Sequence, residues 1–351
     1  MDVHQVLVAA GTGDAITNEA LRLREELRTR GGSEIYAYHR DPRLDGVLPL
    51  DAMGPPSGDS LLVAHSSIGE KAVFDFLSGR PEPLVVRYHN ITPAEFFEPY
   101  DPGFARLLRL GREELVELRS RVRKAVAVSE FNKKELLTAG YARTAVVPLV
   151  TDTAALAATP VVQEPIWLPS RGEGPLVLFV GRIAPNKAQH RLIQAFHVLK
   201  TYLRQDAQMC LVGGRGVAGY SNALERYVRE LALRDLTLTG AISQAELAAV
   251  YRRADVFLSL SEHEGFCAPL LEAMAFDVPI VALDRGAVAE TLGRAGVLLD
   301  DGGAAVAAEA VHQVLENSEL ASHLVEAGRR RVLQFRPEVT VRALADEILA
   351  A

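Results

Sequence analysis

Short apolar runs, separated by amphipathic segments of helix length, constrain this chain of 351 residues more than any other feature. In the first half the runs lie at 5–10, 34–38, 61–65, 84–89, 125–129 and 145–150. In the second half they lie at 176–181, 208–214, 236–240, 256–260, 279–283 and 296–299. The clearest helical segments between them are 18–30, 188–203, 221–233 and 244–254. Strands that are apolar along their whole length are typical of parallel sheets covered by helices on both faces, so the pattern predicts an α/β fold with doubly wound sheets.

The chain is longer than a single hydrophobic core usually supports, so we expect two domains. A proline-rich stretch at 159–175, TPVVQEPIWLPSRGEGP, is typical of a connection between domains. We therefore expect a Rossmann-like N-terminal domain over 1–165 and a second Rossmann-like domain over 166–335. A short polar break precedes the last helix, and we expect residues 336–351 to cross back onto the first domain.

Composition excludes several classes of protein. The net charge of -7 argues against nucleic-acid binding, which needs a basic face. The two cysteines, Cys210 and Cys267, lie in apolar runs, which indicates buried thiols in a reducing compartment. No apolar stretch is long enough to span a membrane, and no signal peptide is visible, so we expect a cytoplasmic protein.

Ligands of parallel sheets bind beyond the carboxyl ends of the strands, so the loops after the strands are where functional residues are expected. The first of these loops contains Gly11 and Gly13, but Ile16 stands where a dinucleotide fingerprint has its third glycine. This argues against a nicotinamide cofactor. Asp14 has two equally weighted interpretations, a helix N-cap or an acceptor for a ligand hydroxyl, and we retain Gly13 and Asp14 as acceptor-side candidates.

Two histidines, His65 and His89, end apolar strands in the first half. A lone histidine is usually structural, but two at neighbouring strand ends favour a functional role. His89 is the stronger candidate, because a neutral imidazole can donate a hydrogen bond to a sugar hydroxyl or a carbonyl without the desolvation cost of a charge. His65 remains an acceptor-side candidate.

In the second half, Gly181 ends a strand and is followed by Arg182 and by Lys187, which we expect to open a helix. A cation at a helix N-terminus opposes the helix dipole, which suggests that an anion binds nearby. Two cations that converge with a helix N-terminus suit a pyrophosphate. A solvated charge pair is the less favoured alternative.

Glu264 and Glu272 frame the turn GFCAP, and Pro269 can occupy the first turn of the following helix, which places Glu272 in that first turn. A capping box from Ser261 to Glu264 is the structural alternative, and it is disfavoured because the helix is expected to begin after Glu264. Backbone N–H groups between two carboxylates would suit a sugar phosphate. No second histidine lies at zinc-site spacing from His263, so no metal is expected.

These residues together resemble a known family. Gly181, Arg182 and Lys187, followed by Glu264-x7-Glu272 within EHEGFCAPLLEAMA, resemble the retaining GT-B glycosyltransferases of family 4. The resemblance covers 176 to about 300. The first half resembles a bacterial branch of the family through YHNITPAEFF and SEFNKKEL, although it has GTGDA where many relatives have a Gly-Gly pair.

The resemblance implies a GT-B fold, in which two Rossmann-like domains face each other across a cleft. Arg182 and Lys187 would neutralise the pyrophosphate, and Glu264 would bind hydroxyls of the donor sugar. His89 would face that sugar, and Glu272 would bind the ribose. Further donor contacts are implied for Gly181, Ile242, Gly265, Phe266, Cys267 and Ala268.

The implied reaction transfers a hexose from a UDP- or GDP-linked sugar to an acceptor hydroxyl, with retained anomeric configuration and same-face attack. Neither a cofactor nor a metal is expected, and the absence of an Asp-x-Asp motif agrees with this. The acceptor would be a glycan, a lipid-linked sugar or a small molecule. A sugar-nucleotide epimerase of GT-B shape and a non-catalytic nucleotide-sugar-binding protein are the alternatives. The arginine-rich amphipathic segment 104–126 is better explained as a solvated helix face than as a peripheral membrane contact.

Overall fold

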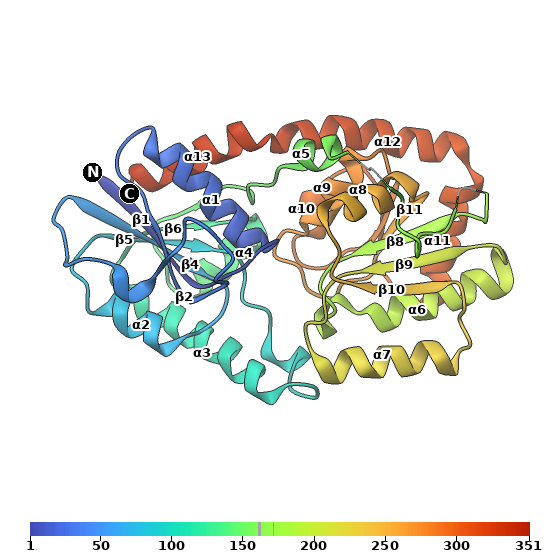
Figure 1. The fold of residues 1–351 in the computed structure, drawn as a ribbon, viewed down its shortest axis with the longest axis horizontal. Coiled ribbons are helices and arrows are strands. Elements are labelled where there is room, and N and C mark those ends of the chain that lie inside the picture. The colour runs from blue at the N-terminus through green and yellow to red at the C-terminus, as the bar shows by residue number, and fades with distance from the viewer. Residues whose placement is uncertain (161–162, 171) are drawn as a thin grey trace. The chain divides into compact units, whose positions relative to one another are not determined.

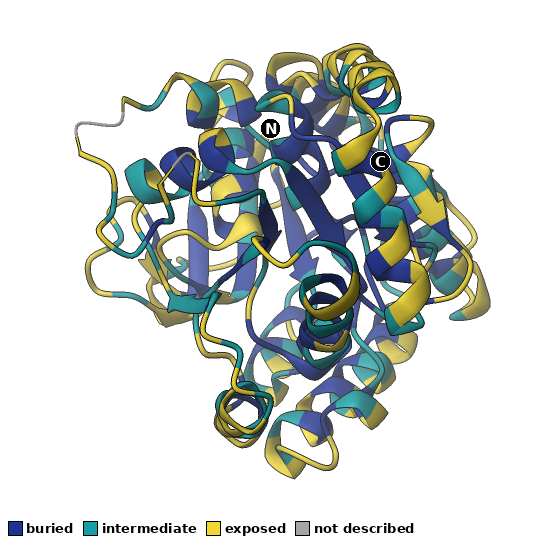
Figure 2. Cartoon of the chain, turned by 90° about the vertical axis from the view of Figure 1, so that its right-hand side faces the viewer, coloured by how far each residue is buried: buried dark blue, intermediate teal, exposed yellow. Residues whose placement is uncertain are grey.

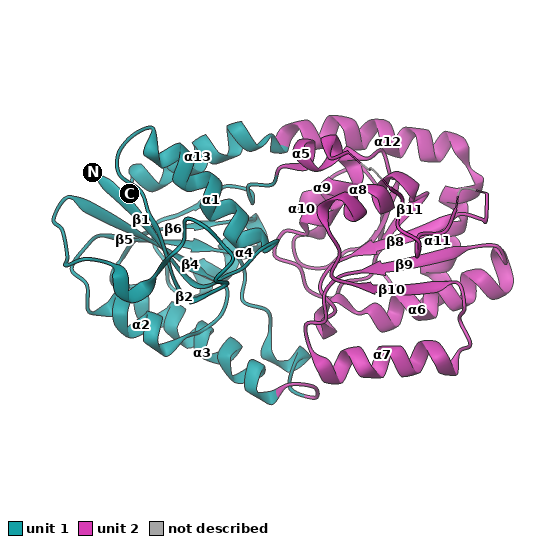
Figure 3. Ribbon diagram, in the orientation of Figure 1, with its two compact units in different colours: residues 1–98, 102–151, 335–351 teal, residues 99–101, 152–334 magenta. Residues whose placement is uncertain are grey.

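A computed structural model describes residues 1–160, 163–170 and 172–351 of the protein (Figure 1). The expected domain connection at 159–175 includes residues 161, 162 and 171, which lie outside the described residues. The chain forms two compact units (Figure 3). Unit 1 comprises residues 1–98, 102–151 and 335–351, and unit 2 comprises residues 99–101 and 152–334.

Unit 1 contains a seven-stranded parallel sheet in the order β3-β2-β1-β4-β5-β6-β7. Its strands are β1 (Asp2–Ala10), β2 (Ile35–Arg40), β3 (Leu48–Pro49), β4 (Ser60–Ser66), β5 (Leu84–Tyr88), β6 (Val122–Ala127) and β7 (Thr144–Val146). Its helices are α1 (Ala15–Arg28), α2 (Lys71–Ser78), α3 (Pro102–Leu118), α4 (Glu130–Thr138) and α13 (Pro337–Leu349), with 3-10 turns at Leu50–Ala52 and Ala94–Phe96. A further 3-10 turn at Leu333–Phe335 crosses the boundary from unit 2 into unit 1.

One face of this sheet packs against α1 and the last helix, α13. The shared core includes Val63 and Val85 from the sheet, Leu23 from α1, and Leu344 and Ile348 from α13, all fully buried. The C-terminal residues are therefore part of the hydrophobic core of unit 1.

Unit 2 contains a six-stranded parallel sheet in the order β10-β9-β8-β11-β12-β13. Its strands are β8 (Leu176–Val180), β9 (Gln208–Val212), β10 (Leu236–Gly240), β11 (Val256–Ser259), β12 (Ile280–Leu283) and β13 (Val297–Leu299). Its helices are α5 (Thr153–Ala158), α6 (Gln189–Val198), α7 (Ala218–Glu230), α8 (Gln244–Arg253), α9 (Ala268–Ala275), α10 (Val288–Leu292), α11 (Ala304–Glu316) and α12 (Ser318–Val332), with a 3-10 turn at Pro185–Lys187. Figure 2 shows dark blue strands inside helices whose outer faces are yellow.

All twelve predicted strands are present, and β3 is the one described strand that the apolar pattern missed. The helix expected over 188–203 is α6 followed by a π-helical turn at Leu199–Leu203. The N-terminal part of unit 1 ends at Thr151 rather than near residue 165, and the chain returns to unit 1 at Phe335. The difference arises because α5 packs against α8 and α9, so the chain joins unit 2 before the proline-rich stretch begins.

The amphipathic segment at 104–126 forms α3 and part of β6. Helix α3 buries Ala105, Leu108, Gly111, Leu115 and Leu118 along one face. A single buried stripe with charged residues on the other face is ordinary for a helix that covers a sheet. Of the helices in the described part of the chain, none has the length and hydropathy that a membrane span requires.

Candidate active site

The strand order of unit 2 brings together the two loops that carry Lys187 and Glu264. Strands β8 and β11 are hydrogen-bonded neighbours, and the chain builds the sheet outward from them in opposite directions. Such a reversal is the switch point at which open α/β sheets bind ligands, beyond the carboxyl ends of the strands. The loops at 181–188 and 260–267 both leave the sheet there.

Lys187 and Glu264, one from each loop, form an ion pair. The Lys187 Nζ lies 2.7 Å from Oε1 and 2.6 Å from Oε2 of Glu264. The Glu264 side chain is 6% exposed and that of Lys187 is 25% exposed, so water screens the pair only partly. A partly buried ammonium held by one carboxylate keeps donor capacity for a second anion, since it carries three N–H groups.

The expectation that Lys187 opens a helix was wrong in detail. Lys187 is the last residue of the Pro185–Lys187 turn, Ala188 follows in the left-handed conformation at φ 50°, and α6 begins at Gln189. The position of Lys187 is therefore explained by Glu264 rather than by the dipole of α6.

The loop that carries Glu264 has a tightly specified backbone. The Ala287 N–H donates to the Glu264 carbonyl at 2.9 Å. A Cβ atom on Gly286, which has φ +61°, would lie 2.3 Å from the same carbonyl oxygen, so only glycine fits there. Helix α9 begins after Cys267, which has φ 68°, and this excludes the capping box from Ser261 to Glu264. The expectation of a helix start beyond Glu264 is confirmed.

Glu272 is the fifth residue of α9, so its predicted position in the first turn was wrong. Its carboxylate accepts a hydrogen bond of 2.8 Å from the hydroxyl of Tyr251 on α8. Burial raises the pKa of Glu272, and the Tyr251 hydrogen bond partly opposes the rise. Sequence reasoning missed Tyr251, because an aromatic residue near the end of an amphipathic helix gives no local signal of a polar partner.

The other donor-side candidates lie in the loops after β8 and β10. The Gly181 N–H donates to the Val212 carbonyl at 2.9 Å, which continues the β8–β9 ladder. Arg182 is exposed, and among the described residues no hydrogen bond or ion pair links its guanidinium to the Lys187–Glu264 pair. Ile242 is half-buried and directly precedes the capping box of α8.

The residues that follow Glu264, up to the start of α9, differ in burial. Phe266 and Cys267 are buried, whereas Gly265 and Ala268 are half-buried. Burial, reinforced by the nearby Glu264, raises the pKa of the Cys267 thiol well above its usual range. Cys267 therefore stays protonated and is suited to packing rather than to nucleophilic chemistry.

In unit 1 the structure shows the contacts of Asp14. Its Oδ2 accepts hydrogen bonds of 2.8 Å from both the backbone N–H and the hydroxyl of Thr17, so Asp14 caps α1. The Gly11 N–H donates to the Thr17 hydroxyl oxygen at 3.1 Å. Gly13 has φ 78°, a conformation that suits glycine. The helix-cap interpretation of Asp14 is the one that the contacts support.

His65 and His89 are in direct contact, with 2.8 Å between Nδ1 of His65 and Nε2 of His89. Beside them lies a fully buried ion pair between Glu19 on α1 and Arg87 on β5. Burial lowers the pKa of His65 to about 4 and that of His89 well below its usual range. Both rings are therefore neutral near pH 7.

The Glu19–Arg87 pair is bidentate, with two N···O distances of 2.8 Å. Burial would raise the pKa of Glu19, but the charge and hydrogen bonds of Arg87 lower it to about 2. Neither residue was predicted. The available signal was an arginine in the middle of the apolar run 84–89.

Three ligand atoms, from Glu19, His65 and His89, lie within 4.8 Å of one another, which is a spacing that can hold a metal ion. Arg87 donates a hydrogen bond of 2.8 Å to each carboxylate oxygen of Glu19. Its positive charge would repel a metal cation bound beside that carboxylate. The donor set therefore fits a proton-sharing network better than a metal site.

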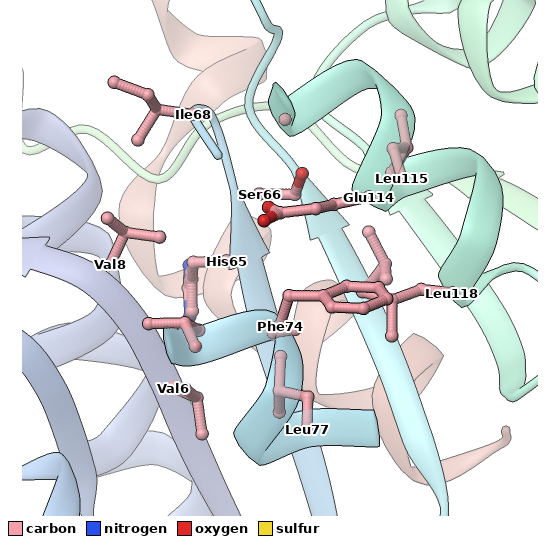
Figure 4. Close-up of a pocket in the computed structure, with 14 residues that line it drawn as sticks. Val6, Val8, His65, Ser66, Ile68, Phe74, Leu77, Glu114, Leu115 and Leu118 are labelled. Atoms are coloured by element: carbon pink, nitrogen blue, oxygen red, sulfur yellow. The ribbon is translucent and has the colours of Figure 1, made fainter. Parts of the chain in front are cut away.

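A cavity of about 40 Å³ lies between the sheet of unit 1 and helices α2 and α3 (Figure 4). Figure 4 shows the Glu114 carboxylate next to Ser66 at this cavity, with His65 on another wall. Burial raises the pKa of Glu114 to about 7. Its Oε1 has no hydrogen-bond partner among the described residues. The cavity is large enough for a water molecule and too small for a sugar.

A comparison with known protein families gives a match that lies within unit 2. Residues 167–331 match the family model described as Glycosyl transferases group 1. The matched stretch contains Lys187, Glu264, Glu272 and Tyr251.

Curated relatives match about half of the chain. A GDP-mannose-dependent alpha-mannosyltransferase of Mycolicibacterium smegmatis is 34% identical over 180 residues, which is 50% of this chain and 42% of the relative. A D-inositol 3-phosphate glycosyltransferase of Kineococcus radiotolerans is 32% identical over 214 residues, which is 55% of this chain and 48% of the relative. The chain thus spans less than half the length of these relatives.

Solved structures resemble both units. Sucrose-phosphate synthase from Thermosynechococcus elongatus has a TM-score of 0.74 at 18% identity and covers 99% of this chain and 98% of its own. Anabaena HepE in complex with UDP-glucose has a TM-score of 0.74 at 17% identity, with 100% and 99% covered. At such identities the likeness concerns the fold, and it confirms the expected GT-B class with two Rossmann-like α/β domains.

Proposed function

We propose that this protein is a retaining glycosyltransferase that moves a hexose from a UDP- or GDP-linked sugar to an acceptor hydroxyl without a metal ion. The observation that carries the proposal is the Lys187–Glu264 ion pair at the switch point of unit 2, inside the stretch that matches glycosyl transferases group 1. A cation and a carboxylate side by side suit a ligand that presents both phosphate oxygens and sugar hydroxyls.

In this proposal the donor lies over the carboxyl ends of β8 and β11. Lys187 and Arg182 bind the diphosphate, and Glu264 accepts hydrogen bonds from sugar hydroxyls. Glu272, held by Tyr251, accepts from the ribose. Gly181, Ile242 and the backbone of 265–268 complete the donor pocket. His89 is proposed as a further ligand of a substrate hydroxyl.

The reaction breaks the bond between the anomeric carbon and the diphosphate oxygen. The acceptor oxygen bonds to that carbon on the face from which the diphosphate leaves, and the acceptor proton passes to the departing phosphate oxygen. Negative charge grows on the β-phosphate, and cations already positioned there lower the barrier electrostatically. No metal is needed in this scheme, because Lys187 and Arg182 supply the positive charge.

The GDP-mannose and UDP-glucose named for similar proteins support testing both bases. A glycan, a lipid-linked sugar or a small molecule is proposed as the acceptor. We propose a cytoplasmic protein, with a peripheral membrane contact through the exposed face of α3 as the weaker alternative. Sedimentation with anionic vesicles tests that alternative.

A panel of UDP-, GDP- and ADP-sugars tests the function. We expect slow release of nucleoside diphosphate from one donor, faster release with the acceptor, and neither from Lys187→Ala. Interconversion of the sugar without release would instead identify an epimerase. Binding without turnover would identify a binding protein, and binding of no donor would overturn the proposal.

A further inference from the structure

The two histidines of unit 1 share one proton in the plane of their rings. The ring planes differ by 13°, the centroids are 5.1 Å apart, and the Nδ1 of His65 lies 2.8 Å from the Nε2 of His89. Nearly parallel rings whose centroids lie 5.1 Å apart while their facing nitrogens lie 2.8 Å apart must meet edge to edge, because both nitrogens then lie on the line between the ring centres. This is the geometry of an N–H···N hydrogen bond. Which ring donates determines what His89 can offer to a ligand.

The direction of this hydrogen bond follows from Gln5 on β1. The Gln5 side-chain amide donates to the Ala20 carbonyl at 2.9 Å, so its Nε2 is fixed on that side. Its Oε1 then faces the Nε2 of His65 at 2.9 Å. An amide oxygen only accepts, so the Nε2 of His65 must carry a proton.

His65 is therefore in the Nε2–H form. It is buried and neutral, and its Nδ1 has a lone pair rather than a proton. A lone pair at 2.8 Å from His89 requires a donor on the other side, so the Nε2 of His89 carries the shared proton. Glu19 reinforces this direction, since its Oε1 lies 3.7 Å from the same nitrogen.

A neutral His89 with a proton on Nε2 has an unprotonated Nδ1. This nitrogen is buried, and among the described residues it has no hydrogen-bond partner. Leaving a buried acceptor unpaired costs about 1–3 kcal/mol, so native structures rarely contain one without a reason.

We propose that Gln5 and His65 are positioning residues that hold His89 in the Nε2–H form, so that His89 presents an acceptor to the substrate. This inference rests on the proposed function. The group that His89 takes is then a donor, a hydroxyl of the transferred sugar or of the acceptor, and not a carbonyl or phosphate oxygen. The sequence-based expectation that His89 donates is thereby reversed.

The first experiment measures the proton positions directly. The full chain, labelled with ¹⁵N in histidine, is studied by long-range ¹H–¹⁵N correlation near pH 7. The spectrum of His89→Asn assigns the His89 signals among the nine histidines. We expect His65 and His89 both to show a protonated Nε2 and an unprotonated Nδ1. A proton on the Nδ1 of His89, a charged ring, or the signature of a metal-bound imidazole would overturn the inference.

The second experiment compares two substitutions of His65. In His65→Gln the amide oxygen can accept from His89 while the amide nitrogen donates to Gln5, so the direction of the network is kept. In His65→Leu it is lost. We expect turnover to fall about 10-fold or more in His65→Leu and only a few-fold in His65→Gln, as expected for loss of one positioned hydrogen bond, with the Kd for UDP or GDP unchanged in both. His89 should show both tautomers in His65→Leu.

Equal turnover in the two variants with an unchanged His89 tautomer would overturn the positioning role. The wild-type spectrum needs no variant to fold, so the inference can be tested even if His65→Leu is unstable. Failure of the proposed function appears separately, as no release of nucleoside diphosphate from any donor. Release together with an Nδ1–H His89 would reject this inference alone.

Discussion

The Lys187 ammonium touches both carboxylate oxygens of Glu264, at 2.7 and 2.6 Å, and joins the two loops at the switch point of unit 2. The pair is largely withdrawn from water, so removing either partner leaves a poorly solvated charge. The same geometry offers a ligand an anion-binding and a hydroxyl-binding group only a few ångströms apart.

Replacing Lys187 by alanine should reduce turnover about 100-fold or more, because one preorganised cation is lost from the leaving group. Lys187→Arg should retain part of the activity, since it keeps the charge. Measured rates of nucleoside diphosphate release test this, with Arg226→Ala on the exposed face of α7 as a control that should match wild type. Near-normal turnover in Lys187→Ala would place the site elsewhere.

Glu264→Gln keeps the shape of the side chain but removes its charge. Hydrogen bonds to a charged acceptor are worth about 1.5–3 kcal/mol, so we expect turnover to fall about 10- to 100-fold. Steady-state kinetics check this against Glu230→Gln, an exposed carboxylate of the same unit. A loss confined to thermal stability, with unchanged turnover, would make Glu264 structural.

Tyr251→Phe removes the hydroxyl that holds Glu272 and leaves the aromatic packing intact. A single hydrogen bond of this kind is worth about 0.5–1.5 kcal/mol, so nucleotide affinity should fall about 2- to 10-fold. Isothermal titration with UDP and GDP measures this. Tyr202→Phe, at a residue that is 76% exposed, should bind as wild type does. Identical nucleotide affinities for Tyr251→Phe and wild type would show that the Tyr251–Glu272 hydrogen bond does not contribute to nucleotide binding.

Breaking the pair between Glu19 and Arg87 should destabilise the protein severely. Glu19→Gln leaves Arg87 as an uncompensated buried charge, which typically costs about 3–5 kcal/mol. The folded pKa of Glu19, about 2, lies below its ordinary 4.5. The pair therefore contributes stability that is complete above about pH 4.5 and is lost as pH falls toward 2. Urea unfolding at several pH values measures both effects, with the exposed Glu25→Gln on α1 as the control. A cost below 1 kcal/mol would contradict the burial argument.

Glu114 should show the opposite pH dependence. Its folded pKa, about 7, lies above its ordinary 4.5, so its favourable contribution is present below pH 4.5 and is lost as pH rises to 7. Glu114→Gln should therefore be more stable than wild type by about 1–2 kcal/mol at pH 8, allowing for partial solvent access, and equal to it at pH 4. Glu113→Gln, exposed on the same helix, should change neither value. Lower stability of Glu114→Gln at pH 8 would show that its carboxylate is needed in charged form.

The strands were predictable because a strand buried on both faces must be apolar along its length. β3 escaped because two residues, Leu48 and Pro49, are too few to form a pattern. Helix boundaries were shifted by a few residues, as at α1, where Asp14 rather than a later residue is the cap.

The candidate site was only partly predictable. Lys187 and Glu264 were each singled out, yet their pairing depends on β8 lying next to β11, which is a property of sheet order and not of local sequence. Glu19 and Arg87 lie 68 positions apart, and a charge inside an apolar run has no interpretation until its partner is known. The positions of the protons on His65 and His89 likewise depend on Gln5, which belongs to no recognisable sequence motif.

Arg87 does more than balance the charge of Glu19, since its guanidinium also donates to the carbonyls of Ala127, Val147 and Pro148. Glu19 in turn accepts from the Val150 N–H. Substituting both residues by hydrocarbons would remove all of these side-chain hydrogen bonds. The Ala127 carbonyl would keep its bond from the Val147 N–H at 3.0 Å, but the Val150 N–H would lose its carboxylate acceptor, so even a paired change would carry a cost. A single substitution leaves a buried charge without its partner, and a double substitution removes hydrogen bonds to the backbone. Both positions should therefore tolerate fewer substitutions during evolution than most of the exposed residues around them.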